Sequence, residues 1–240
     1  MAFLKMPYLP QSKPLFAIGD RKSESFNVFE PFCHPLLPEG LKKHADLTFC
    51  YLGDGLAVCA PESYEYYTSV LKNIPIKLLP GSTSLDRHYP KDATYNVAIV
   101  GKRIFCKKDI TDRVLLNCAE EIGYKIVNMN QGYGKCSVCP IDEHGAISAD
   151  MSFVKAAEKE GVEVLYITND TISLKGYKNG FFGGSAYMEN KNTLTVAGNI
   201  DLHPDSDRIK AFVEKRNIKI KSDCNLPITD FGSMIILTEV

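Results

Sequence analysis

The chain has 240 residues, of which 45% are hydrophobic, so it can bury a large core as one domain or as two small ones. Its 28 Lys and Arg residues balance 29 Asp and Glu residues. With a net charge of −1, the protein lacks the overall positive charge that is typical of proteins that bind nucleic acid or an anionic membrane. Prolines and lysines interrupt the apolar residues of 1–20, so we expect no signal peptide, no membrane span and a cytoplasmic protein.

The first segment, 13–40, contains one predicted strand (PLFAIGD) and no convincing helix. Two apolar runs joined by a glycine-containing turn follow at 46–60, then a helical pattern at 61–73 and a strand at 74–81. The same order recurs at 93–129, where Asp109 or Thr111 is the predicted N-cap of the helix. The sequence therefore predicts repeated strand-strand-helix-strand units.

Three later stretches share a turn, a small hydroxylic residue and an apolar run: YGKCSVCPIDEHG, FFGGSAYMENKN and TDFGSMIILTE. Their serines, Ser137, Ser185 and Ser233, are separated by equal steps of 48 residues. A strand-strand-helix-strand unit cannot bury its own apolar faces, so five units are expected to pack around a common axis as a closed α/β propeller. An ordinary mixed sheet with layered helices is the alternative.

The eight cysteines include a C-S-V-C pair, Cys136 and Cys139. A disulfide framework would require secretion, and no second pair with zinc-ligand spacing exists. A thioredoxin-like pair should begin a helix, whereas KCSVCPID has the pattern of a strand that starts at Cys136. We therefore expect mostly buried thiols, no metal and no cofactor. In such a strand, Lys135 should face away from Cys136.

The five units resemble the pentein fold, also called the guanidino-group modifying enzyme fold. PYLP, QGYGKCSVC, GFFGGS, LHPD and DFGSMI are similar, over nearly the whole chain, to an uncharacterised group of clostridial-type proteins assigned to that fold. The resemblance implies a five-bladed pentein propeller in a single domain, 1–240. Catalytic penteins use a cysteine nucleophile, a histidine acid/base and acidic residues that hold a guanidinium group.

In those enzymes the nucleophile stands in the last repeat, where this chain has Gly232, Ser233 and Met234 and no cysteine. If the order of the repeats is circularly shifted, earlier repeats can supply the cysteine, the histidine and the acidic residues of the catalytic site. The strand of QGYGKCSVC then implies Cys136 as the nucleophile, and HADLTFCYLGDGLAV implies His44 as the acid/base. The two lie 92 residues, or about two repeats, apart.

The acidic residues implied by the shifted site are Asp46, as the orienting group, and Asp230, as the first acid of the turn TDFGS. Ser233 replaces the second acid, which weakens cation binding. Together with Ser185 and Ser137 it is a candidate substrate-binding residue. The predicted activity is a cysteine-dependent hydrolase or transferase acting on a guanidino, amidine or amide compound.

Several alternatives stay open. Cys136 can be a buried structural thiol, and His44 can be an exposed residue after LKK. The protein can be a pentein that only binds a small molecule or a macromolecule in a central cavity, or an unrelated α/β protein. The sequence leaves the oligomeric state, the substrate and the pathway undetermined.

Overall fold

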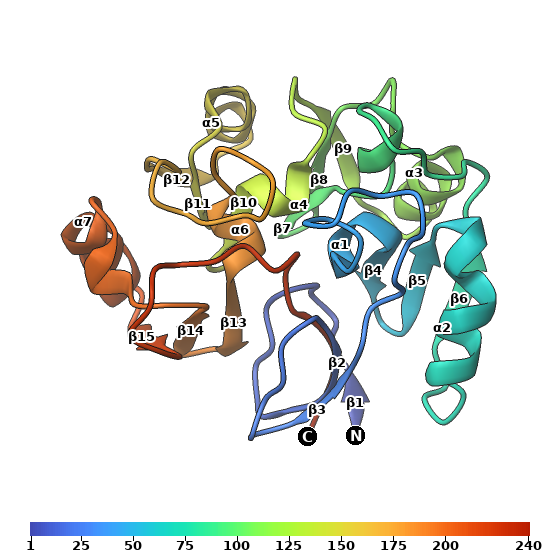
Figure 1. Ribbon diagram of the computed structural model, residues 1–240, viewed down its shortest axis with the longest axis horizontal. Coiled ribbons are helices and arrows are strands. Elements are labelled where there is room, and N and C mark those ends of the chain that lie inside the picture. The colour runs from blue at the N-terminus through green and yellow to red at the C-terminus, as the bar shows by residue number, and fades with distance from the viewer.

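The computed structural model describes residues 1–240 and contains five small sheets, which surround the short helices α1 (Ala45–Thr48), α4 (Gly134–Ser137) and α6 (Phe182–Ser185) in Figure 1. The first sheet and its helices comprise β4 (Phe49–Gly53), β5 (Leu56–Cys59), η1 (Pro61–Ser63), α2 (Tyr64–Val70) and β6 (Lys77–Pro80). The second unit comprises η2 (Lys91–Ala93), β7 (Ala98–Val100), β8 (Arg103–Cys106), α3 (Arg113–Glu121) and β9 (Lys125–Asn128).

The third unit comprises β10 (Val138–Pro140), β11 (Gly145–Ser148), α5 (Met151–Lys159) and β12 (Glu163–Tyr166). The fourth comprises β13 (Ala186–Asn190), β14 (Thr193–Val196), η3 (Ile200–Leu202), α7 (Ser206–Glu214) and β15 (Lys219–Ser222). In each of these four sheets the first two strands pair antiparallel and the last two pair parallel. The predicted strand-strand-helix-strand order is therefore present in four units.

The fifth sheet joins the two ends of the chain. Its strand order is β1 (Ala2–Phe3), β16 (Ile235–Glu239), β2 (Pro14–Ile18) and β3 (Asn27–Phe29). No helix lies between β2 and β3, as the sequence of 13–40 predicts. The C-terminal strand thus serves as the first strand of a unit that the N-terminal segment completes, and it lies against β4.

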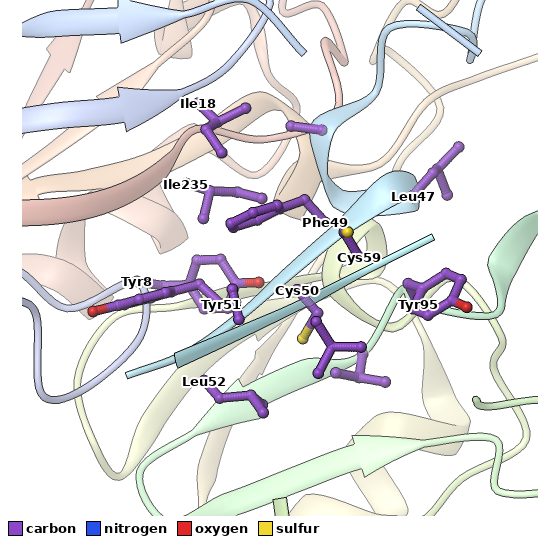
Figure 2. Close-up of a cluster of buried hydrophobic side chains, with 14 of the residues drawn as sticks. Tyr8, Ile18, Leu47, Phe49, Cys50, Tyr51, Leu52, Cys59, Tyr95 and Ile235 are labelled. Atoms are coloured by element: carbon purple, nitrogen blue, oxygen red, sulfur yellow. The ribbon is translucent and has the colours of Figure 1, made fainter. Parts of the chain in front are cut away.

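The core holds the units together. Every residue of β4 is buried, and Figure 2 shows Phe49 of this strand beside Ile18 and Ile235, which come from the two ends of the chain. All eight cysteines are free thiols, and burial raises the pKa of Cys106 and Cys139 to about 11. These two thiols behave as buried hydrophobes. None of the helices has the length and apolar character needed to cross a membrane.

The N-cap of α3 is Asp112, not Asp109 or Thr111 as the sequence suggested. Its carboxylate accepts hydrogen bonds from the backbone N–H groups of Val114 and Leu115 and from Ser82. Burial opposes its ionisation, but these hydrogen bonds outweigh burial and hold the pKa of Asp112 below its ordinary value of 3.8.

Asp112→Ala is expected to lower the free energy of unfolding at pH 7 by about 1–2 kcal/mol, because the helix loses its cap. Asp109→Ala, on the same segment but without cap bonds, should cost less than about 0.5 kcal/mol. Because the folded pKa of Asp112 is depressed, its contribution is present at neutral pH and is lost as the pH falls through that pKa. Urea unfolding at pH 7 and near about pH 3 checks both statements; equal effects of the two substitutions would contradict the assigned cap.

Candidate functional site

Short turns precede the first strands of the sheets and bring residues from distant repeats to one place. Helices α1, α4 and α6 each run directly into such a strand, and the turn 230–233 stands in the same position before β16. Cys136 lies in the short helix α4, not in the strand, which begins at Val138; the strand prediction was wrong by two residues. A helical turn separates neighbouring side chains by about 100° instead of about 180°, so Lys135 and Cys136 can both face the centre.

Glycines allow these turns to approach one another closely. A Cβ atom at Gly184 would lie 2.1 Å from Oδ1 of Asp230, and one at Gly232 would lie 2.3 Å from the Cα of His44. Gly232 also has a φ of 76°, in the left-handed region that favours glycine. The glycines of GFFGGS and TDFGS are therefore needed for close packing around the site.

Cys136 is held by Asn96 and faces Asp46. The backbone N–H of Cys136 donates to Oδ1 of Asn96 at 3.1 Å, and Nδ2 of Asn96 donates to the sulfur at 3.2 Å. The thiol donates to Oδ2 of Asp46 at 3.3 Å, and Nδ2 of Asn96 also reaches the backbone carbonyl of Asp46 at 3.0 Å. Asn96, which the sequence analysis missed, precedes β7 as the other site residues precede their strands. Alignment of the repeats is the signal that could have found it.

His44 is buried next to Asp230, contrary to the alternative of an exposed residue after LKK. Nδ1 of His44 lies 3.9 Å from Oδ1 of Asp230, which is ion-pair distance but too long for a hydrogen bond. Backbone N–H groups of Phe181 and Gly232 donate to the Asp230 carboxylate at 2.9 and 3.0 Å. Nδ1 of His44 and Oδ1 of Asp46 have no hydrogen-bond partner. Two buried polar atoms are thus left free inside the site.

Lys135 and Ser233 complete the centre. Nζ of Lys135 donates to the carbonyl oxygen of Gly183 at 2.6 Å and to Oγ of Ser233 at 3.0 Å, so this side chain points inward, and the expectation that it faces away was wrong. The Ser233 hydroxyl lies 2.6 Å from Oδ2 of Asp46, to which it donates. Ser233 has a φ of 70°, a strained conformation for a non-glycine residue, and strain of this kind gathers at functional sites.

The other two predicted binding serines do not share this role. The hydroxyl of Ser137 donates to the carbonyl of Gly134 at 3.1 Å, and that of Ser185 donates to the carbonyl of Phe182 at 3.0 Å. Each hydroxyl is occupied within its own helix, as is common for serine at the end of a short helix. The 48-residue spacing therefore marks equivalent places in the fold, and only Ser233 reaches the site.

Burial and two carboxylates control the protonation of the thiol. Burial raises the pKa of Cys136 well above 9.0, and the nearby charges of Asp46 and Asp230 raise it further, while the hydrogen bond from Asn96 lowers it. Burial also raises the pKa of Asp230 above 3.8, with His44 opposing the shift. Without a bound cation, Cys136 is a protonated thiol at neutral pH.

Three potential metal ligands also meet here. One donor atom from each of His44, Asp46 and Cys136 lies within 4.8 Å of the other two. Zinc prefers nitrogen, sulfur and carboxylate donors at about 2.0–2.3 Å, so these residues are the set that could hold such an ion. The resemblance had already grouped these three residues as a catalytic set, but no metal-ligand spacing marks them, because Cys136 lies 90 residues after Asp46.

The side chains of the candidate site are buried. Cys136 and Lys135 each expose only 2% of their surface. Tyr133 and Phe181, which precede α4 and α6, are half-buried beside this site, and their ring centroids are 6.2 Å apart. The five main surface pockets are lined by other residues. The side chains of Cys136 and Lys135 are therefore shielded from solvent in this conformation.

Comparisons with known proteins agree with this architecture. The structure is similar to that of an amidinotransferase of saxitoxin biosynthesis from Microseira wollei. The match covers 91% of this chain and 91% of that chain, with 11% sequence identity and a TM-score of 0.55. For the agmatine deiminase of C. jejuni, the coverage is 92% of this chain and 90% of that one, with 9% identity and a TM-score of 0.55. The match to the inosamine-phosphate amidinotransferase of Streptomyces griseus covers 100% of this chain and 98% of that chain, with 9% identity and a TM-score of 0.52.

At such low identity these likenesses establish the fold alone, which is the pentein fold of guanidino-modifying enzymes. They do not test the similarity to a clostridial-type group, which stays a prediction. A comparison with curated protein sequences finds no match. Residues 21–235 match a family described as a family of unknown function, DUF6873. The chain, which has the pentein fold, therefore belongs to the DUF6873 family.

Proposed function

We propose that the protein is a cysteine-dependent hydrolase or transferase acting on a guanidino, amidine or amide compound, with Cys136 as nucleophile, His44 as acid/base and Asp46 and Asp230 as cation-binding carboxylates. The observation that carries the proposal is the meeting of donor atoms of Cys136, His44 and Asp46 within 4.8 Å in a buried site. A nucleophile and a base at this separation can come within hydrogen-bond reach through a small rearrangement or one water molecule.

The charges of the site favour a cationic substrate. Asp46 and Asp230 are two buried acidic side chains, whereas Lys135 is the one buried lysine among these residues, so the acidic groups outnumber the lysine by one. An uncompensated buried charge is unfavourable. An amidinium or guanidinium ion would balance it, and N–H groups of the ion could bond the free Oδ1 of Asp46.

The proposed reaction begins when this cation binds beside the thiol. Its positive charge lowers the pKa of Cys136, and the thiol proton passes to His44. The sulfur attacks the amidino carbon, forming a C–S bond, and the C–N bond breaks as His44 returns the proton to the departing amine. When the substrate is a guanidinium, the resulting thiouronium group reacts with water, which yields a urea-type product, the free thiol and a proton. In a transferase, an amine takes the place of water.

The architecture around this site is part of the same proposal. We infer that residues 1–240 form a single pentein domain whose five sheets are the blades of a propeller around a pseudo-fivefold axis. Its support is that β7 lies against β10, β10 against β13, and β16 against β4. The nucleophile then stands in the third unit because the order of repeats is circularly shifted.

A second candidate is a pentein that binds a ligand without reaction. The buried, protonated state of Cys136 and the replacement of the second acid by Ser233 favour it. One similar solved structure, a dimethylarginine dimethylaminohydrolase from Pseudomonas aeruginosa, is complexed with citrulline, so this fold can hold a small molecule. In a binding protein, Cys136 would have no special reactivity.

Alkylation by 2-chloroacetamidine at neutral pH separates the two candidates. We expect this cationic probe to label Cys136 faster than the other seven thiols, including the exposed Cys33, as read by peptide mass spectrometry. His44→Ala should lower this rate at least about tenfold, the lower part of the range for acid–base groups. His203→Ala, which removes another buried histidine, should leave the rate unchanged. Uniformly slow labelling of all eight thiols would rule out the enzyme.

A further inference from the structure

We propose that Lys135 is a specificity-determining residue, whose buried ammonium group balances Asp46 from within, so that the site accepts a reacting group with a single positive charge. The inference rests on the proposed function, because it assumes that a ligand binds between Asp46, His44 and Cys136. It adds a residue and a charge limit to that proposal.

Lys135 is built into the centre instead of reaching toward solvent. Long charged side chains are almost never fully buried unless their charge is paired. Here Nζ donates to the carbonyl oxygen of Gly183 and to the hydroxyl of Ser233, and it lies 5.0 Å from the centroid of the Tyr8 ring. The last contact is within cation–π range. These three partners are formally neutral, so the charge that balances this lysine must come from a residue farther away.

Ser233 connects the ammonium group to Asp46. Its hydroxyl has one proton, which has two acceptors within reach: Oδ2 of Asp46 at 2.6 Å and the carbonyl of Gly183 at 3.1 Å. The carboxylate is the closer and the stronger acceptor, because hydrogen bonds to ionised groups are shorter and stronger. Ser233 therefore accepts from Lys135 while donating to Asp46. An acid in place of Ser233 would instead form a direct ion pair with Lys135.

This arrangement limits what Asp46 can offer to a ligand. Its Oδ2 already accepts hydrogen bonds from Ser233 and from the Cys136 thiol, whereas its Oδ1 has none. While the thiol keeps its proton, Asp46 can therefore hold a cation through one oxygen and does not form the two-oxygen clamp that binds a guanidinium most tightly. With Lys135 present, one added positive charge makes the site neutral, and a second would again leave it unbalanced.

Two alkylating reagents of nearly the same shape test the role of Lys135. The rate of Cys136 labelling by cationic 2-chloroacetamidine is divided by the rate with neutral 2-chloroacetamide. Both reactions require the thiolate, so its abundance cancels in the ratio. We expect Lys135→Met to raise this ratio about tenfold, because the site gains an uncompensated negative charge. Lys135→Arg, which keeps the charge, should stay within about threefold of the unsubstituted protein.

A purely structural role would change both rates together. An unchanged ratio in a folded Lys135→Met variant would overturn the inference. If that variant does not fold, Ser233→Ala, which interrupts the connection to Asp46, should raise the ratio about threefold; no change would overturn the inference equally. Failure of both reagents to label Cys136 in the unsubstituted protein would instead reject the proposed function.

A binding measurement tests the role of Lys135 even if neither reagent labels Cys136. Acetamidinium chloride should raise the melting temperature of Lys135→Met more than that of the unsubstituted protein, since binding to the folded state stabilises it. This comparison needs no reactive thiol. Equal shifts would overturn the role of Lys135 whether or not the protein is an enzyme.

Discussion

Asp46→Asn is expected to change the reactivity of Cys136 in opposite directions toward cationic and neutral reagents. The carboxylate raises the pKa of the thiol, both by its charge and by accepting the thiol proton in a hydrogen bond. Its removal therefore increases the thiolate fraction at neutral pH, and labelling by 2-chloroacetamide should become several-fold faster. Labelling by 2-chloroacetamidine should become slower, because the cation loses its partner.

The size of the second effect follows from the burial of Asp46. Removing one member of a buried charge pair costs about 2–5 kcal/mol. Because about 1.4 kcal/mol corresponds to a factor of ten, the rate with the cationic reagent divided by the rate with the neutral reagent should fall about 30-fold or more. Asp92→Asn is the matched control: Asp92 is also buried, but its carboxylate bonds the hydroxyl of Tyr133. If both reagents change in the same direction in Asp46→Asn, this carboxylate does not receive the cation.

Much of the fold could be predicted because its signals are local. A glycine-containing turn between two apolar runs identifies a strand pair, as at Gly53 and Gly55, whose φ angles are 96° and 75°. The segment 13–40 lacks a helical pattern, and no helix forms there. The sequence analysis also paired Cys136 with His44 through the resemblance to the pentein fold, and donor atoms of the two residues lie within 4.8 Å of each other.

The rest of the site depends on details that sequence patterns do not carry. Strand alternation would turn Lys135 away from Cys136, but a single helical turn replaces the start of the strand and brings both side chains inward. The left-handed conformation of Ser233 distinguishes it from Ser137 and Ser185, although all three occupy the same place in their repeats. The burial of the site results from the packing of residues that precede β4, β7, β10, β13 and β16, one strand from each of the five sheets.

Gly232→Ala is expected to lower the stability of the protein strongly, because the turn 230–233 presses against the backbone of His44. An added Cβ would lie 2.3 Å from both Cα and Cγ of His44, and the backbone atom cannot move aside as a flexible side chain could. Overpacking of this kind costs about 1–3 kcal/mol. The left-handed φ of 76° adds about 1–2 kcal/mol for any residue with a Cβ atom.

Gly123→Ala separates these two contributions. Gly123 ends helix α3 with a φ of 87°, and no atom lies within 4 Å of the position of its Cβ. This variant should therefore show only the conformational cost of about 1–2 kcal/mol. Urea midpoints compared at equal slope measure the difference.

Gly232→Ala should also displace His44 and slow the labelling of Cys136 by 2-chloroacetamidine. Equal losses of stability in the two variants would mean that the turn does not hold His44, and the proposed acid/base would lose its structural support.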